Sequence, residues 1–196
     1  MKPYIIGLTG GIASGKTAAG KAMESLGAKI IDADVVSRKV TEAESEGFMR
    51  LKEAFPNCVD GDKLDRKRLK SMVFSDREKL QQLNSLTWTL IEEEIRRQIA
   101  RLSESDTAVL VVPLLFESGL DVLADVVVTV SADERIRLKR VISRDGVDEK
   151  TALSVINAQM CDAEREKRSD YVLDGNGELS SLEAEAKELY ARLANQ

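Results

Sequence analysis

Short apolar runs alternate with amphipathic segments along most of the chain. The apolar runs predict β-strands at residues 4–9, 29–32, 108–112, 126–130 and 171–173. They do not alternate cleanly between apolar and polar residues, which is typical of strands buried on both faces. Segments with helical spacing follow at residues 16–26, 35–40, 133–143, 148–159 and 181–193. This alternation predicts an α/β fold, with a parallel β-sheet and helices on both faces.

The stretch from about residue 44 to residue 102 interrupts the alternation, because it is rich in helix and contains no convincing strand. Its apolar side chains form one stripe at helical spacing: Leu80, Leu83, Leu86, Leu90, Ile91, Ile95, Ile99 and Leu102. Such a stripe is typical of core packing. We therefore expect a helical insertion at about 44–103, with a surface turn at 103–106. The core then comprises about 1–43, 104–132 and 160–196.

Composition narrows the class of protein. The chain has 196 residues, is 43% apolar and has a net charge of −5, which argues against nucleic-acid or membrane-surface partners. Its two cysteines form no CxxC pair, and no leader or membrane-spanning run is visible, so we expect a cytoplasmic protein. The absence of histidine excludes histidine-based nucleophile triads and histidine metal sites. We expect a monomer or a small homo-oligomer.

The segment GGIASGKT at residues 10–17 matches the G-x-x-x-x-G-K-[ST] motif of a phosphate-binding loop. It follows a predicted strand and opens a predicted helix, which is the context that the motif requires. Small residues let backbone N–H groups converge on an anion, and the helix N-terminus adds its positive dipole end. Lys16 can reach the β- and γ-phosphates of a nucleotide, and the Thr17 hydroxyl can bind Mg²⁺. The alternative, a glycine-rich turn that binds nothing, is disfavoured by this context.

Motifs elsewhere in the chain favour a kinase over other nucleotide-binding proteins. The nearest match to a guanine-reading Asn-Lys-x-Asp is DKLD at residues 62–65, which has the wrong first residue. A motor ATPase usually has an acidic residue at the tip of a second buried strand. Here no carboxylate precedes Pro113 in that strand. A small-molecule kinase fits best.

Two carboxylates, Asp32 and Asp34, lie at the end of a predicted strand and the start of a helix. Phosphoryl transfer to an alcohol needs a group that orients the acceptor, and Mg²⁺ needs acidic support. One carboxylate could serve each task. Either residue alone could instead be a helix cap, since aspartate is favoured there.

The run DERIRLKRVISRDG at residues 133–146 is basic, and Arg137, Arg140 and Arg144 share one helix face. In phosphotransferases such arginines close over the nucleotide and stabilise the charge of the transition state. The alternative is a solvated helix face, paired with Asp133, Glu134 and Asp145. Both interpretations stay open at the level of the sequence.

These blocks together resemble the dephospho-coenzyme A kinase family. The resemblance covers nearly the whole chain, through the blocks GLTGGIASGKT, IIDAD, LDRKRLKSMVFSD, VVPLLFESGL, RIRLKRVISRDG, INAQM and SDYVLDGNG. It implies transfer of the ATP γ-phosphoryl group to the ribose 3′-hydroxyl of dephospho-CoA, the last step of coenzyme A synthesis. It also implies a helical CoA-side domain and a lid, here at about 133–159.

The resemblance assigns roles residue by residue. Asp34 matches the acceptor base, and Asp32 its supporting carboxylate, which can also contact Mg²⁺ through water. Lys16 and Arg140 join Asp34 in catalysis, while Arg140 and Arg144 match lid residues over ATP. Arg66 and Leu115 match substrate-side positions, although an ordinary surface arginine is an equal alternative for Arg66. The ATP-binding loop comprises Gly10, Gly11, Ile12, Ala13, Ser14, Gly15, Lys16, Thr17 and Ala18.

The sequence departs from the family pattern at three places. The usual loop glycine is Ala13, a change that should be tolerated unless the position needs a positive φ. A His-Pro pair common on the long helix is Trp88-Thr89, where Trp88 could pack on the pantetheine arm or adenine. An asparagine usual after the last strand is Gly175, with Asn176 next to it. Another P-loop kinase and a non-enzymatic nucleotide-binding domain are the competing hypotheses.

Overall fold

The computed structural model describes residues 2–74 and 76–194, so Ser75 of the LDRKRLKSMVFSD block lies outside the described residues. The chain forms two compact units. The first unit combines residues up to 32 with those from 102 onward, and the second comprises residues 33–101. The finer division expected from the sequence, with an insertion at 44–103 and a lid at 133–159, stays a prediction.

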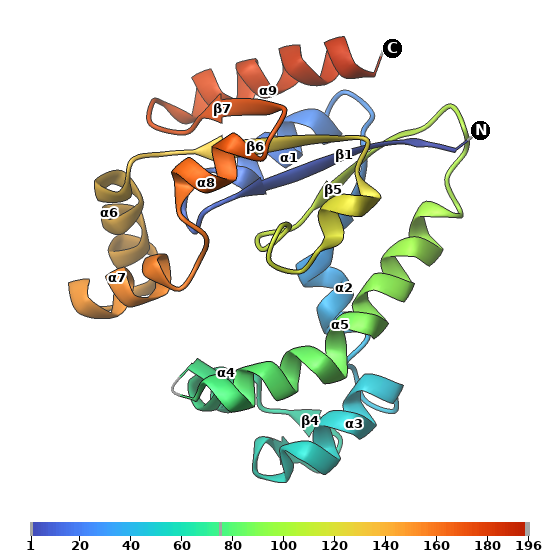
Figure 1. Ribbon diagram of the computed structural model, residues 1–196, viewed down its shortest axis with the longest axis vertical. Helices are drawn as coiled ribbons and strands as arrows, with labels where there is room; N and C mark the ends of the chain where they lie inside the picture. The colour runs from blue at the N-terminus through green and yellow to red at the C-terminus, as the bar shows by residue number, and fades with distance from the viewer. Residues whose placement is uncertain (1, 75, 195–196) are drawn as a thin grey trace. The chain divides into compact units, whose positions relative to one another are not determined.

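The first unit is built on a parallel five-stranded sheet (Figure 1). Its strands, in spatial order, are β2 (Lys29–Asp32), β5 (Thr107–Val111), β1 (Tyr4–Gly10), β6 (Val126–Ser131) and β7 (Tyr171–Asp174). All neighbouring strands are parallel. The predicted α/β fold class is therefore confirmed, and each predicted strand lies within one residue of its observed bounds. Because the strands are parallel, their carboxyl ends gather at one edge, where ligands of such sheets bind.

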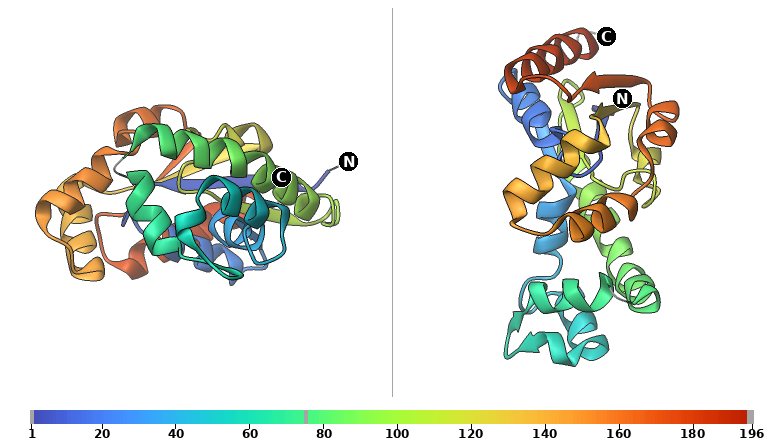
Figure 2. Two further views of the ribbon diagram at one scale, coloured as in Figure 1. Left: turned by 90° about the horizontal axis from the view of Figure 1, so that it is seen from below. Right: turned by 90° about the vertical axis from the view of Figure 1, so that its left-hand side faces the viewer.

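Two helices cover one face of this sheet. These are α1 (Lys16–Glu24) and α9 (Leu179–Leu193), which lie side by side (Figure 2). Their buried residues, among them Met23 and Leu189, form one core with Ile6, Leu8 and Val128 of the strands. Burial of such side chains is the main force that holds the layers together, at about 1.5–3 kcal/mol for each large one.

The remaining helical segments of the first unit follow β5 and β6. They are η2 (Leu120–Leu123), α6 (Glu134–Asp145), α7 (Glu149–Asn157) and α8 (Asp162–Lys167). On the second face of the sheet, the segment after β5 packs closely against Gly7 of β1. A Cβ at Gly7 would lie 2.9 Å from Cβ of Ala124 and 3.2 Å from Cδ2 of Leu115. Glycine at this position lets that segment cover the strand.

The second unit is mainly helical. It contains α2 (Ala33–Lys39), α3 (Glu46–Ala54), η1 (Pro56–Cys58), β3 (Val59–Asp60), β4 (Lys63–Leu64), α4 (Arg66–Phe74) and α5 (Arg77–Ile99). Ile95 of the predicted apolar stripe is fully buried, and Leu83 and Leu86 pack on a cluster around Leu51 and Phe55. These three residues of the stripe therefore pack in the core, whereas Leu80 at its start is exposed.

Two expectations from the sequence were wrong. The segment 44–102 does contain strands, because β3 and β4 form an antiparallel hairpin around Gly61. Strands of two residues are too short to show any periodicity. The helix α8 was also missed, since its sequence DAEREK has a single apolar residue and no helical stripe. The predicted turn at 103–106 is present, with the Asp106 N–H donating to the Ser103 carbonyl at 3.0 Å. No helix of the described ranges is both long and apolar enough to span a membrane.

Candidate active site

The segment between β1 and α1 forms a glycine-rich loop at the carboxyl edge of the sheet. Strand β1 ends at Gly10, and α1 begins at Lys16. Gly15 lies between them with φ 113°, in a conformation that L side chains rarely adopt, and a Cβ there would meet Leu182 at 2.6 Å. Glycine is therefore needed at Gly15 for both conformation and space.

The start of α1 is suited to an anion. Gly15 supplies no side-chain cap, and its carbonyl accepts the first helical bonds, from Ala18 at 2.9 Å and Ala19 at 3.2 Å. The first N–H groups of a helix have no partner within the helix and point along its axis. Lys16 and Thr17 stand in the first turn, so a cation and a hydroxyl lie beside these N–H groups.

Ala13 adopts the left-handed conformation, with φ 61°. The sequence predicted that alanine would be tolerated here unless the residue needed a positive φ. Because φ is positive, replacing the usual glycine with alanine strains the backbone. A non-glycine residue in this region costs about 1–2 kcal/mol. Such strain persists only where the surroundings hold the backbone in place.

The three arginines predicted to share one face of α6 have three different environments. Arg140 Nη1 donates to the carbonyls of Ala13 at 3.2 Å and Ser14 at 3.4 Å. Arg144 is half exposed and pairs with Asp145 at 2.7 Å, a bond that raises the pKa of the Arg144 guanidinium. Arg137 is buried. The solvated-face interpretation therefore fits only Arg144.

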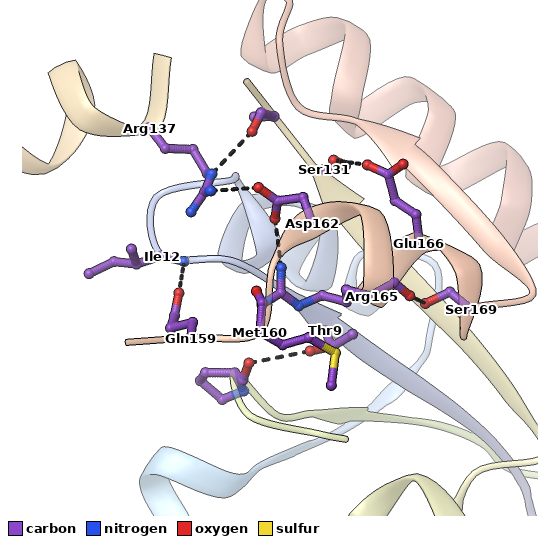
Figure 3. A network of polar contacts seen from close by, with 12 residues as sticks. Thr9, Ile12, Ser131, Arg137, Gln159, Met160, Asp162, Arg165, Glu166 and Ser169 are labelled. Carbon is purple, nitrogen blue, oxygen red and sulfur yellow. Dashed lines mark hydrogen bonds and ion pairs between the residues drawn. The ribbon is translucent and has the colours of Figure 1, made fainter. Parts of the chain in front are cut away.

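Arg137 belongs to a buried ionic network (Figure 3). Its Nη2 donates to Oδ2 of Asp162 at 2.5 Å, and its Nε donates to the Ala132 carbonyl at 3.1 Å. The second oxygen of Asp162 accepts from Arg165 Nη1 at 2.6 Å. One carboxylate thus pairs with two arginines, whose side chains are only 5% and 2% exposed. The cluster lies against the loop, because a Cβ at Gly11 would meet Arg137 Nη1 at 2.7 Å.

The loop after β7 also borders the phosphate loop. A Cβ at Gly175 would lie 2.2 Å from the Ser14 carbonyl oxygen, so only glycine fits. The next side chain, Asn176, accepts a hydrogen bond from the Asp133 N–H at 2.7 Å. A hollow of about 430 Å³ lies here, with a lining that includes the carboxylates of Asp133 and Asp174. Phosphate groups are therefore better placed at the glycine-rich loop than in this hollow.

The two predicted carboxylates belong to different units, because Asp32 is the last residue of the first segment of unit one and Asp34 is the second residue of the second unit. Asp32 ends β2, in register with Val111 of β5. Asp34 lies in the first turn of α2, which begins at Ala33, and is exposed. An acidic residue in a first turn also interacts favourably with the helix dipole. Both the catalytic and the helix-stabilising interpretations of Asp34 are compatible with this position.

The two remaining residues predicted on the substrate side, Arg66 and Leu115, are engaged in contacts with other parts of the protein. Arg66 donates to the Thr41 hydroxyl at 2.8 Å and to the Arg38 carbonyl at 3.1 Å. Burial, and after it the neighbouring Arg38 cation, lower the pKa of the Arg66 guanidinium. Leu115 is fully buried under β1. A substrate would meet the exposed neighbour Leu114 before the Leu115 side chain.

Four residues at the loop were not assigned from the sequence: Gln159, Asp162, Arg165 and Gly175. Gln159 lies in the INAQM block, but no spacing rule pointed to it. Its Oε1 accepts from the Ile12 N–H at 2.8 Å, across 147 positions of sequence. Contacts between such distant residues leave no trace in local periodicity, so only the fold brings them together.

A parallel sheet with a glycine-rich loop between its central strand and the following helix defines the class of the protein, a P-loop nucleotide-binding protein. Residues 4–181 match the family model described as dephospho-CoA kinase. A dephospho-CoA kinase of Corynebacterium diphtheriae is 40% identical over 98% of this chain and 98% of its own. The chain belongs to the dephospho-CoA kinase family.

Solved structures agree with this assignment. A protein of Thermus thermophilus has a crystal structure with a TM-score of 0.84 and 33% identity, covering 98% of this chain and 99% of its own. The dephospho-CoA kinase from Campylobacter jejuni has a TM-score of 0.73 and 26% identity, over 97% of both chains. As a P-loop kinase, the protein takes ATP as its phosphoryl donor and a small molecule as its acceptor.

Proposed function

We propose that this protein transfers the γ-phosphoryl group of ATP to the ribose 3′-hydroxyl of dephospho-CoA, giving coenzyme A and ADP. The observation that supports this most directly is the phosphate loop at the carboxyl end of β1, in a chain that matches the dephospho-CoA kinase family from residue 4 to 181. We expect the reaction to take place in the cytoplasm, in a monomer or a small homo-oligomer.

Donor binding falls to the phosphate loop and the start of α1. The loop from Gly10 to Ala18 surrounds the phosphates, with the Ile12 N–H bound instead to Gln159, and Lys16 neutralises charge that develops on the γ-phosphoryl oxygens. The exposed Thr17 hydroxyl and the Asp32 carboxylate are the oxygen donors that Mg²⁺ prefers. When bound, Mg²⁺ would stabilise charge on the β- and γ-phosphates.

Acceptor activation falls to Asp34, which accepts the proton of the 3′-hydroxyl as the new P–O bond forms and the bond to ADP breaks. Asp32, two residues earlier, supports it. In this proposal Asp34 takes the proton of the acceptor, while Lys16 stabilises negative charge on the transferred group. Neutral asparagine at residue 34 can orient the hydroxyl but cannot take its proton.

The lid at about 133–159 contributes Arg140 and Arg144. The guanidinium of Arg140 lies on the carbonyls of Ala13 and Ser14, which places its positive charge beside the phosphates that the loop would hold. Arg66 and Trp88 contribute to the CoA side, whereas Leu115 is fully buried and can act only as packing beneath its neighbours. Trp88 is 40% exposed, which leaves a face of the indole for the pantetheine arm or adenine.

The first test is ADP release from Mg·ATP with and without dephospho-CoA. We expect release that depends on dephospho-CoA, and we expect Asp34→Asn to lower kcat by about 10²–10⁴-fold while KM for ATP stays close to that of the wild type. Asp62→Asn, an exposed aspartate in the turn between β3 and β4, is the matched control and should retain full activity.

Each alternative predicts a different result. Turnover with a nucleoside or another alcohol but not with dephospho-CoA would indicate another P-loop kinase. ATP binding without acceptor-dependent ADP release would indicate a non-enzymatic nucleotide-binding domain. A near-normal kcat for Asp34→Asn would make Asp34 a helix-stabilising residue instead of the base.

A further inference from the structure

The side chain of Gln159 is bound to the phosphate loop. Its Oε1 accepts a hydrogen bond from the backbone N–H of Ile12 at 2.8 Å (Figure 3). Only the carbonyl oxygen of a glutamine amide can accept a hydrogen bond, so this contact also determines the orientation of the amide. The Ile12 N–H is thereby directed at the segment after α7, and the peptide between Gly11 and Ile12 is held in one orientation.

Gln159 is itself held from its C-terminal side. The N–H of Met160 donates to Glu117 Oε1 at 3.0 Å, and the Met160 carbonyl accepts from Arg165 Nη2 at 2.6 Å. Both polar groups of this backbone unit are therefore bound by side chains. Arg165 is 1% exposed and continues through Asp162 into the buried ionic network at the end of β6. Polar contacts and the backbone between Gln159 and Met160 thus connect Ala132, the residue after β6, with Ile12.

The loop needs such support next to Ile12. Ala13 has φ 61°, which a non-glycine residue keeps only when its surroundings hold it. The contact of Gln159 lies on the N-terminal side of this strained residue. On its C-terminal side, Arg140 Nη1 donates to the carbonyls of Ala13 and Ser14. Two side chains from outside the loop therefore hold the left-handed residue from both directions.

We propose that Gln159 is a positioning residue for ATP binding, which keeps the phosphate loop in its anion-binding conformation around Ala13. Its side chain contacts the loop backbone, and we assign it no contact with the transferred phosphoryl group and no part in proton transfer. Its effect passes through the Ile12 peptide to the loop N–H groups that meet the phosphates. The inference rests on the proposed function, since it assumes that the loop binds ATP.

The test compares Gln159→Met, which keeps the length of the side chain and loses the strong acceptor, with the wild type. Gln81→Met makes the same chemical change at an exposed glutamine of α5 and is the matched control. Hydrogen exchange of the Ile12 amide, measured by NMR without nucleotide, reports on the contact itself. KM for ATP, KM for dephospho-CoA and kcat report on its consequence.

We expect Gln159→Met to accelerate exchange at Ile12 by about three- to tenfold, the range for loss of one neutral hydrogen bond. KM for ATP should rise by a similar factor, with KM for dephospho-CoA unchanged. Gln159→Glu keeps an acceptor oxygen and should restore slow exchange at Ile12. Gln81→Met should change none of these quantities.

Three results would overturn the proposal. Exchange at Ile12 that is the same in Gln159→Met and the wild type would show that Gln159 does not hold the loop. Faster exchange at Ile12 with an unchanged KM for ATP would show that the hydrogen bond has a structural role only and does not affect ATP binding. A wild-type protein that bound no ATP would overturn the proposed function and this role with it, while exchange at Ile12 would still show whether the contact exists.

Discussion

Removal of the Asp162 carboxylate should destabilise the first unit strongly. Asp162→Ala leaves Arg137 and Arg165 without their shared counter-charge, although the two guanidinium groups stay buried, with side chains only 5% and 2% exposed. Breaking one buried ion pair by truncating a partner costs about 3–5 kcal/mol. Asp162 is itself 24% exposed, so water can replace part of the carboxylate. We therefore expect a loss of about 3 kcal/mol, toward the lower end of that range.

The measurement is unfolding followed by circular dichroism. Fluorescence is unsuitable, because the single tryptophan, Trp88, lies in the second unit, whereas Asp162 lies in the first. For a chain of this size, 3 kcal/mol corresponds to a fall in Tm of roughly 6–12 °C. The matched control is Glu92→Ala, which breaks an exposed pair with Arg96 at 2.8 Å. That pair should contribute only about 0–0.5 kcal/mol. If Asp162→Ala were no more destabilising than Glu92→Ala, the buried network would not stabilise the fold, and the reasoning would be refuted.

Three further predictions follow from the site and the second unit. Gly175→Ala should raise the Kd for ATP by at least about tenfold in calorimetry, because its Cβ would lie 2.2 Å from the Ser14 carbonyl oxygen and displace the loop; Gly177→Ala, where a Cβ has open space, is its control. Lys16→Ala should lower kcat by about 10²–10³-fold in the ADP-release assay, with an unchanged circular dichroism spectrum. The pKa of Glu94 is lowered from 4.5 to about 2, chiefly by the hydrogen bond from Lys39. The ionised Glu94 carboxylate therefore contributes its full share of the free energy of unfolding above pH 4.5, and this contribution is lost as the pH falls toward 2. Glu94→Gln should remove that part of the pH dependence in urea unfolding between pH 5 and about 2, and an unchanged profile would contradict it.

The parts of the fold that the sequence predicted well depend on local signals. A strand buried on both faces has a continuous apolar run, and the phosphate loop has glycine, lysine and threonine at set spacings, so the bounds of β1 and the start of α1 could be placed. The hairpin at Gly61 has no such signal, because its strands are two residues long. Its conformation follows from the packing around it.

The environment of the arginines on α6 could not be predicted for a different reason. A charged run has the same sequence pattern whether it faces water, a loop or a buried partner. Arg137 is buried because Asp162, 25 positions later, supplies the counter-charge. Arg140 contacts the loop because α6 passes next to Ala13 and Ser14. Helical periodicity identifies residues that share a face, but tertiary packing decides what that face meets.

Ala13 shows how far a motif determines a phosphate loop. The motif specifies glycine at Gly10 and Gly15 and leaves the four residues between them open. The structure distinguishes those four, since Gly11 has no room for a side chain beside Arg137, whereas Ala13 has a side chain in a left-handed conformation. A loop that tolerates alanine there must be held by contacts from outside the motif. Gln159 and Arg140 make such contacts from either side of Ala13, so the conformation of this loop is a property of the whole first unit.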